Sequence, residues 1–235
     1  RFSLEQLEEY LRAGVRLVIL SNLHNPTGRA LDPALLEEAA RRIEAARAYL
    51  LVDEVYLDYL GERAPASAFR LGPTTISTSS LTKVYGLGAL RAGWAIASSG
   101  IVSRAYAIRD HLGVVAAGPA MLYSRAAFGV LDRIGTWSRD RAARGRAVID
   151  RVLATEPSLS WVPPDAGIVG LIELPDGLDD RKLSDHLEQR HRTLVTPGDF
   201  FGAPGTVRVG FGGEPAETEE GLRRLIQGIH ELTGA

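Results

Sequence analysis

The sequence predicts an α/β protein: a mostly parallel sheet with helices on both faces, followed by a small α+β unit. Two observations predict this. Apolar strand patterns alternate with a helix long enough to serve as the crossover connection that parallel strands require. After residue 100 the chain turns helical, and from about 156 short strand patterns return between helices. We therefore expect a partial large domain at 1–135 and a small C-terminal domain at 136–235.

The elements of the large domain follow in order. The first residues, RFSLEQLEEYLRAG, are typical of an amphipathic helix with Ser3 as N-cap and Gln6 three positions on. The apolar run VRLVIL at 15–20 predicts a strand covered on both faces. Asp32 and Pro33 predict the start of a helix. Further strands are expected at 49–56, 74–80 and 89–97.

The remaining elements are mainly helical. Helices are expected at 101–113, 119–132, 136–155 and near 180–191. Between and after them we expect a turn at 163–167, then strands at 168–174, around 193–197 and at 206–211. A last helix places Leu222, Leu225, Ile226, Ile229 and Leu232 on one face.

The composition excludes several function classes. The chain has 235 residues, 27 basic and 29 acidic side chains, a net charge of -2 and no cysteine. Without cysteine there is no disulfide, thiolate metal site or cysteine nucleophile, which fits a cytoplasmic protein. The near-zero charge and the absence of a long apolar run argue against nucleic-acid and membrane partners. His186 and His191 are five positions apart on an expected helix and would not share a face, so we expect no metal site.

The lysines are the first pointer to chemistry. Of the 27 basic residues only Lys83 and Lys182 are lysines. Arginine stays protonated and cannot form a Schiff base, whereas a lysine amine can. Lys83 lies between the end of an expected strand and a glycine-rich turn, which makes it the candidate nucleophile.

Four motifs together indicate a family. HNPTG at 24–28, DEVY at 53–56, SSLTKVYGLGALRAGW at 79–94 and VRVGFG at 207–212 resemble those of the class I and II aminotransferases, pyridoxal-phosphate (PLP) enzymes of fold type I. Asn25, Asp53, Lys83 and Arg208 follow one another at intervals of 28, 30 and 125 positions. The resemblance covers the whole chain, and its specificity comes from the combination of motifs.

The resemblance implies a role for each matching residue. Lys83 would form the Schiff base with PLP and carry the proton between the substrate Cα and the cofactor. The remaining cofactor ligands would be Asp53 at the pyridine nitrogen, Tyr56 and Asn25 at the phenolic oxygen, and Ser80 and Arg91 at the phosphate, with Thr82 adding a hydroxyl contact. Arg91 lies in the expected strand at 89–97, where an unpaired charge would be costly. Arg208, assisted by Asn25, would hold the substrate carboxylate in a bidentate pair.

Two departures from the family pattern are visible. The family's N-terminal part, with an amide loop for the phosphate and an aromatic side chain stacked on the ring, has no counterpart here. The stretch at 111–123 is unusually apolar, which weakens any transfer of intersubunit phosphate contacts from the family. A homodimer is expected from the resemblance alone.

Three functions are compatible with these residues. The first is transfer of an amino group between an amino acid and a 2-oxo acid. The second is another fold type I reaction, such as β-elimination by a C–S lyase or an oxidation, because it would use Lys83, Asp53 and Arg208 alike. The third is an aminotransferase-like sensor domain of a transcription regulator, which a helix-turn-helix upstream would reveal.

Overall fold

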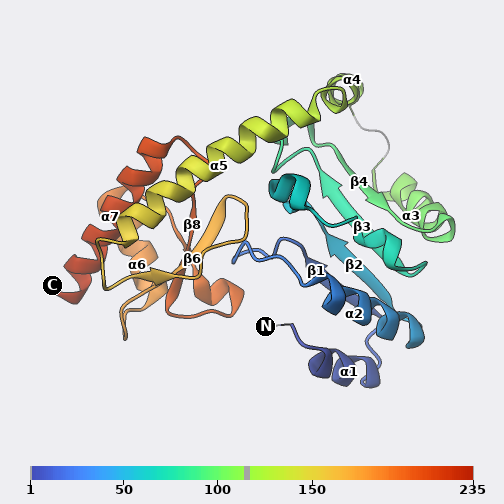
Figure 1. Ribbon diagram of the computed structural model, residues 1–235, viewed down its shortest axis with the longest axis horizontal. Coiled ribbons are helices and arrows are strands. Elements are labelled where there is room, and N and C mark those ends of the chain that lie inside the picture. Colours follow the sequence, from blue (N-terminus) through green and yellow to red (C-terminus); the bar gives the residue numbers. More distant parts are fainter. Residues whose placement is uncertain (1, 114–116, 235) are drawn as a thin grey trace. The chain divides into compact units, whose positions relative to one another are not determined.

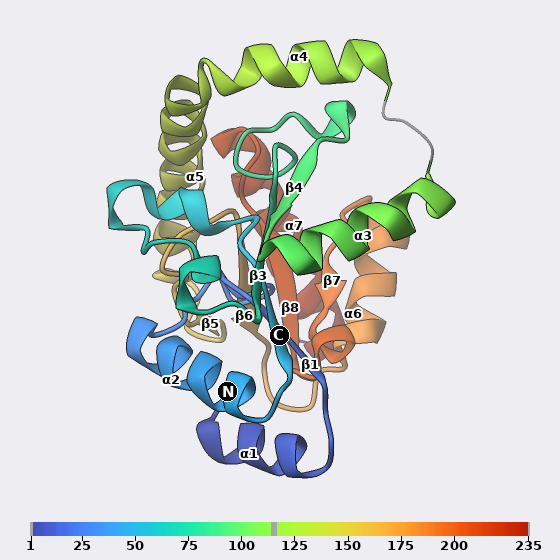
Figure 2. The same cartoon turned by 90° about the vertical axis from the view of Figure 1, so that its right-hand side faces the viewer.

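The computed structural model describes residues 2–113 and 117–234, and it divides into two compact units. Figures 1 and 2 show its elements from two directions. The first unit runs up to His24 and resumes over Ala30–Thr136; the second comprises Asn25–Arg29 and the chain from Trp137 onward. The segment Asn25–Arg29 therefore belongs to the second unit, whereas we expected all of residues 1–135 in the large domain. It packs with the second unit, where the carbonyl of Gly28 accepts a hydrogen bond from the Asp165 amide.

The first unit contains a four-stranded sheet in the order β1-β2-β3-β4. Its strands are β1 (Leu17–Ser21), β2 (Tyr49–Asp53), β3 (Thr75–Ser80) and β4 (Gly93–Ile96). The first three are parallel, with α2 (Pro33–Ala45) as the crossover from β1 to β2, and β4 is antiparallel to β3. Short 3-10 helices connect β2 to β3: η1 (Leu57–Arg63) and η2 (Ala68–Leu71).

The expected strand at 89–97 is wrong in its first half. Residues Gly88–Leu90 form the 3-10 turn η3, and Arg91 follows in the left-handed conformation with φ 51°. The strand begins only at Gly93. Because β4 runs antiparallel, the chain must reverse after β3, and this reversal takes up the first residues of the apolar pattern.

One face of this sheet is packed against α1 (Leu4–Arg12) and α2. The caps are those expected: Ser3 Oγ accepts from the Gln6 amide at 3.2 Å, and Asp32 Oδ1 accepts from the Leu35 amide at 2.9 Å. The buried residues of this core are Leu7, Leu36, Ala39, Ala40, Ile43, Ala48, Leu50, Val52 and Ala68. On the other face of β1, Ile19 is 63% exposed, so the expectation of a strand covered on both faces is wrong for this chain.

Three helices follow the first sheet: α3 (Ser99–Leu112), α4 (Gly118–Phe128) and α5 (Leu131–Leu153). The expected helix at 119–132 is interrupted because Gly129 ends α4. The apolar stretch noted at 111–123 covers the end of α3, its C-cap Gly113, the N-cap Ala117 and the start of α4; residues 114–116 are outside the described residues. Of the helices that the structure describes, none combines the length and apolar character needed to cross a membrane.

The second unit is built on an antiparallel sheet in the order β5-β6-β8-β7. Its strands are β5 (Ser160–Trp161), β6 (Val169–Glu173), β7 (Thr196–Pro197) and β8 (Thr206–Gly210). Its helices are α6 (Asp180–His186), the π-helical turn η4 (Leu187–His191), the 3-10 turn η5 (Gly198–Phe201) and α7 (Pro215–Thr233). The core includes Ile149 of α5, Ile172 of β6, Val207 of β8, and Leu225 and Ile229 of α7.

The π-helical turn corrects one expectation. In an α-helix residues five apart point in different directions, whereas a π-helical turn closes i to i+5 hydrogen bonds and brings such residues closer in angle. His186 and His191 stand at the two ends of this widened turn, and their ring centroids are 5.5 Å apart. The two side chains therefore can share a face, and the expectation that they would not, which assumed a regular α-helix, is wrong.

Candidate functional site

Asp53 ends β2 at the carboxyl edge of the parallel strands. Its Oδ1 accepts hydrogen bonds from the Val55 amide at 3.2 Å and from Thr78 Oγ1 at 3.3 Å. Thr78 is the registered partner of Asp53 on β3, so the strand pairing itself supplies one of these donors. In the described part of the chain both of these hydrogen bonds engage Oδ1, which leaves Oδ2 available for another donor.

Lys83 follows β3 at the same edge of the sheet. Leu81 and Val84 on either side are buried and anchor the turn, while Lys83 itself is exposed. Its Nζ lies 5.9 Å from the ring centroid of Tyr56, and among the described residues it has no hydrogen-bond or ion-pair partner. Tyr59 supports both residues: its ring stacks on that of Tyr56 at 6.4 Å, and its hydroxyl donates a long hydrogen bond, 3.5 Å, to the Lys83 carbonyl.

Two hydroxyl groups converge just before Lys83. Ser80 Oγ and Thr82 Oγ1 are 2.6 Å apart, and the Thr82 amide donates to Ser80 Oγ at 3.3 Å. The Leu81 amide donates to the Ala92 carbonyl, so the residues next to Arg91 are tied to this turn. The structure therefore places two hydroxyls beside the turn that carries Lys83.

Arg91 is positioned differently from the expectation. It is exposed in the turn before β4, where its Nη1 donates to the Gly88 carbonyl at 3.2 Å. Its charge is therefore not placed in an apolar strand, and that expectation is wrong. Within residues 2–113 and 117–234 its guanidinium forms no ion pair. We call Asp53, Tyr56, Ser80, Lys83 and Arg91 the cofactor half-site.

Arg208 is the centre of a second cluster, in the second unit. It alternates on β8 with the buried Val207 and Val209 and is itself half-buried on the opposite face. Its Nη1 donates to Asn25 Oδ1 at 3.0 Å and its Nη2 to Thr196 Oγ1 at 3.2 Å. The guanidinium carbon also lies 4.9 Å from the ring centroid of Phe201. A guanidinium has five N–H donors, so two hydrogen bonds leave donors for a carboxylate.

The tight turn after Asn25 requires a glycine. Gly28 has φ 64°, and a Cβ at this position would lie 2.4 Å from Pro164 Cβ and 2.9 Å from the Ala166 carbonyl oxygen. The turn thus holds Asn25 in place within the second unit. We call Asn25 and Arg208 the carboxylate half-site.

Sequence reasoning missed four supporting residues. Thr78 donates to Asp53, Tyr59 stacks on Tyr56, and Thr196 and Phe201 hold Arg208. The only available signal was strand pairing, since Thr78 is registered with Asp53 and Thr196 with Arg208. Pairing register is not visible in a single strand pattern, which explains the omission.

Comparison with known proteins identifies a family for this chain. The model of the family "Aminotransferase class I and II" matches residues 1–225. Capreomycidine synthase of Streptomyces vinaceus is 29% identical over 95% of this chain and 58% of its own length. The arginine–pyruvate transaminase AruH of Pseudomonas aeruginosa is 28% identical over 100% of this chain and 61% of its own length.

Solved structures show the same fold. A PLP-dependent aminotransferase from Streptococcus suis superposes with a TM-score of 0.91 and 27% identity, over 97% of this chain and 61% of the other. The chain thus spans about 60% of the length of the proteins that it resembles. With a family model that matches nearly all of its residues, the chain belongs to the class I and II aminotransferases, a family of PLP-dependent enzymes.

Proposed function

We propose that the protein containing this chain is a PLP-dependent aminotransferase, which moves an amino group between an amino acid and a 2-oxo acid. The observation that carries the proposal is the exposed Lys83 amine, which has no hydrogen-bond or ion-pair partner among the described residues. It lies at the carboxyl edge of the parallel strands, beside Tyr56 and at the same edge as Asp53. In open α/β sheets, ligands bind outside the carboxyl ends of the strands.

The residues of the cofactor half-site fit PLP by their chemistry. The cofactor has an aldehyde, a ring nitrogen, a phenolic oxygen and a phosphate. The half-site offers an amine in Lys83, a carboxylate with an available oxygen in Asp53, a phenol in Tyr56, and hydroxyls with a guanidinium in Ser80 and Arg91. Each group of the cofactor therefore has a chemically matched partner on this chain.

Bound PLP would supply an aldehyde that condenses with amines and a ring that withdraws electrons from the substrate Cα. Lys83 Nζ would take the proton from Cα and return it at the next stage. The Asp53 carboxylate, held in place by Thr78 and the Val55 amide, would keep a proton on the ring nitrogen. The Tyr56 hydroxyl would donate to the phenolic oxygen.

Arg208 would bind the substrate through its α-carboxylate. Asn25 and Thr196 each occupy one donor of the guanidinium and Phe201 lies against its face, so its plane is fixed before substrate arrives. A fixed fork orients the Cα–H bond by holding the carboxylate in two hydrogen bonds. Every α-amino acid carries this carboxylate, so Arg208 sets the class of substrate and leaves the side chain undetermined.

We further propose that the working protein is a cytoplasmic homodimer. The absence of cysteine is typical of proteins in a reducing compartment. Helix α4 supports the dimer because Met121, Leu122 and Tyr123 are consecutive apolar residues that are each more than half exposed. Analytical ultracentrifugation of the full-length protein tests this: a monomer at micromolar concentration would contradict it.

A second candidate function is another PLP-dependent reaction that also begins with loss of the Cα proton. It is favoured by the relative named as a synthase, capreomycidine synthase, which is 29% identical to this chain. Transamination predicts ping-pong kinetics, with one oxo acid formed from the donor for each amino acid formed from the acceptor. Ammonia or carbon dioxide released in place of that one-to-one exchange would favour the second candidate.

Covalent trapping tests the assignment of Lys83. Borohydride reduction of the full-length protein should fix PLP on the peptide that contains Lys83. Lys83→Ala should abolish trapping and transamination, while Lys182→Ala, the matched control with the other lysine of this chain, should change neither. A label on Lys182, or full activity of Lys83→Ala, would show that the amine is elsewhere.

A further inference from the structure

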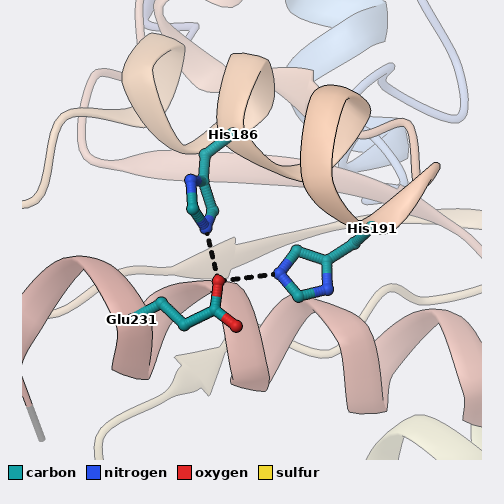
Figure 3. Close-up of side chains that lie close together, drawn as sticks. All are labelled: His186, His191 and Glu231. Atoms are coloured by element: carbon teal, nitrogen blue, oxygen red, sulfur yellow. Dashed lines mark hydrogen bonds and ion pairs between the residues drawn. The ribbon is translucent and has the colours of Figure 1, made fainter.

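Two histidines and a glutamate converge in the second unit, outside both half-sites. Figure 3 shows His186 and His191 approaching the Glu231 carboxylate from the α6–η4 segment, with Glu231 on α7. His186 Nε2 lies 2.7 Å and His191 Nε2 3.0 Å from the same oxygen, Glu231 Oε2. Neither half-site uses any of these side chains, so their convergence needs a separate explanation.

Contacts on both elements hold this cluster in place. The buried Leu187 anchors the π-helical turn, and the turn ends where Arg224 Nη1 and Thr193 Oγ1 both donate to the His191 carbonyl, at 3.0 and 3.1 Å. On α7, Gln227 Nε2 donates to the second carboxylate oxygen, Glu231 Oε1, at 3.0 Å. The arrangement is therefore anchored on both elements.

The donor atoms are those of a transition-metal site. Two imidazole nitrogens and one carboxylate oxygen form a known zinc ligand set, in which water completes the tetrahedron. The three ligand atoms lie within 4.8 Å of one another. Tetrahedral coordination at the usual metal–ligand distances of about 2.0–2.1 Å separates neighbouring ligand atoms by about 3.3 Å. The distances from Glu231 Oε2 to the Nε2 atoms of His186 and His191, 2.7 and 3.0 Å, would have to increase by only a few tenths of an ångström.

Burial and charge also suit a cation. The side chains of His191 and His186 are 9% and 21% exposed, so most of their surface is withdrawn from water, while Glu231 at 38% leaves one side open to solvent. The carboxylate supplies negative charge, and imidazole and carboxylate together favour first-row divalent ions. Water could reach the fourth position from the open side.

We propose that His186, His191 and Glu231 bind a divalent first-row transition metal ion, for which Zn²⁺ is the probe. The ion replaces the two N–H···O hydrogen bonds: each Nε2 binds through its lone pair, and its proton either moves to Nδ1 or leaves to solvent. The bound metal links the π-helical turn to α7 and thereby stabilises the second unit. An ordinary cluster of ion pairs is the competing explanation.

Zinc titration separates the two explanations. The full-length PLP-loaded protein, freed of metal with a chelator, is titrated with Zn²⁺ against a chromophoric competitor. We expect one Zn²⁺ per chain, bound at least roughly tenfold more weakly in His186→Gln, His191→Gln and Glu231→Gln, since even outer-shell changes cost 10–100-fold. The control is His230→Gln on the same helix, because His230 pairs with Glu156 outside the cluster. This variant should bind Zn²⁺ as tightly as the wild type does.

Two further measurements guard against misfolded variants and against metal bound to PLP. Zn²⁺ should raise the melting temperature of the wild type and of His230→Gln, and X-ray absorption should show only nitrogen and oxygen ligands near 2.0–2.2 Å. The proposal is overturned if the wild type binds no Zn²⁺ at millimolar concentration. It is equally overturned if binding is unchanged in all three cluster variants, or if binding requires PLP.

Discussion

The substitution Arg208→Lys tests the carboxylate half-site directly. Lysine keeps the positive charge but has no planar fork, so a bidentate pair with a carboxylate becomes a single contact. It also lacks the two donors that reach Asn25 Oδ1 and Thr196 Oγ1, and the face that lies 4.9 Å from the Phe201 ring. The variant thus loses both the second substrate hydrogen bond and the contacts that orient the first.

The expected loss follows from these contacts. A charge-assisted hydrogen bond contributes about 1.5–3 kcal/mol, and each neutral orienting contact about 1 kcal/mol. Because part of this returns through the lysine amine, we expect a loss of about 2–4 kcal/mol of transition-state stabilisation, or roughly 30- to 1000-fold in kcat/KM. Thr196→Val removes one orienting contact without changing the charge and should cost about 1 kcal/mol, roughly fivefold.

The assay is kcat/KM for the amino donor at saturating acceptor, measured on the full-length protein with PLP content determined by absorbance. PLP should remain bound, because Arg208 is assigned to the substrate. Arg181→Lys is the matched control: Arg181 also pairs with a carboxylate, Asp199, and lies 4.8 Å from the Phe200 ring, but it is exposed and outside both half-sites. If Arg208→Lys retained wild-type kcat/KM, the carboxylate would be bound elsewhere.

Three other predictions concern stability. Gly28→Ala should lower the free energy of unfolding by about 2–5 kcal/mol, because the alanine would have a strained left-handed backbone and its Cβ would lie 2.4 Å from Pro164 Cβ. Gly177→Ala is the control: Gly177 has φ 81° and open space around it, so only the backbone strain should appear. Equal losses of unfolding free energy in the two variants, measured by chemical denaturation, would contradict the steric explanation. Hydrogen bonds from Arg223 and Arg224 lower the pKa of Glu220 to about 2, so its contribution to stability is complete above pH 4.5 and is lost as the pH falls toward 2. The difference in free energy of unfolding between wild type and Glu220→Gln should therefore become smaller as the pH is lowered. A difference that does not change with pH would contradict this. Finally, residues 1–235 expressed alone should aggregate or fail to retain PLP, because β1 and β4 are sheet edges without a further strand in the described part of the chain and Ile19 is 63% exposed. The full-length protein should be soluble and retain PLP, and a soluble, active product from residues 1–235 alone would contradict this prediction.

Much of the architecture could be predicted from the sequence because its signals are local. The caps at Ser3 and Asp32 form as expected, since a cap needs only the next three residues. The alternation of Val207, Arg208 and Val209 follows from the two-residue period of a strand. The family also follows from sequence, because its motifs occur in a fixed order.

Only the tertiary structure decided which side chains meet. Thr196 lies against Arg208 because β7 and β8 pair in one register, and a single strand pattern carries no information about register. Arg91 lies in the turn before β4 and not in the strand, because β4 runs antiparallel to β3 and the chain has to reverse before it. His186 and His191 lie close together because the chain forms a π-helical turn in place of an α-helix, and residue spacing in the sequence does not reveal this difference in hydrogen bonding.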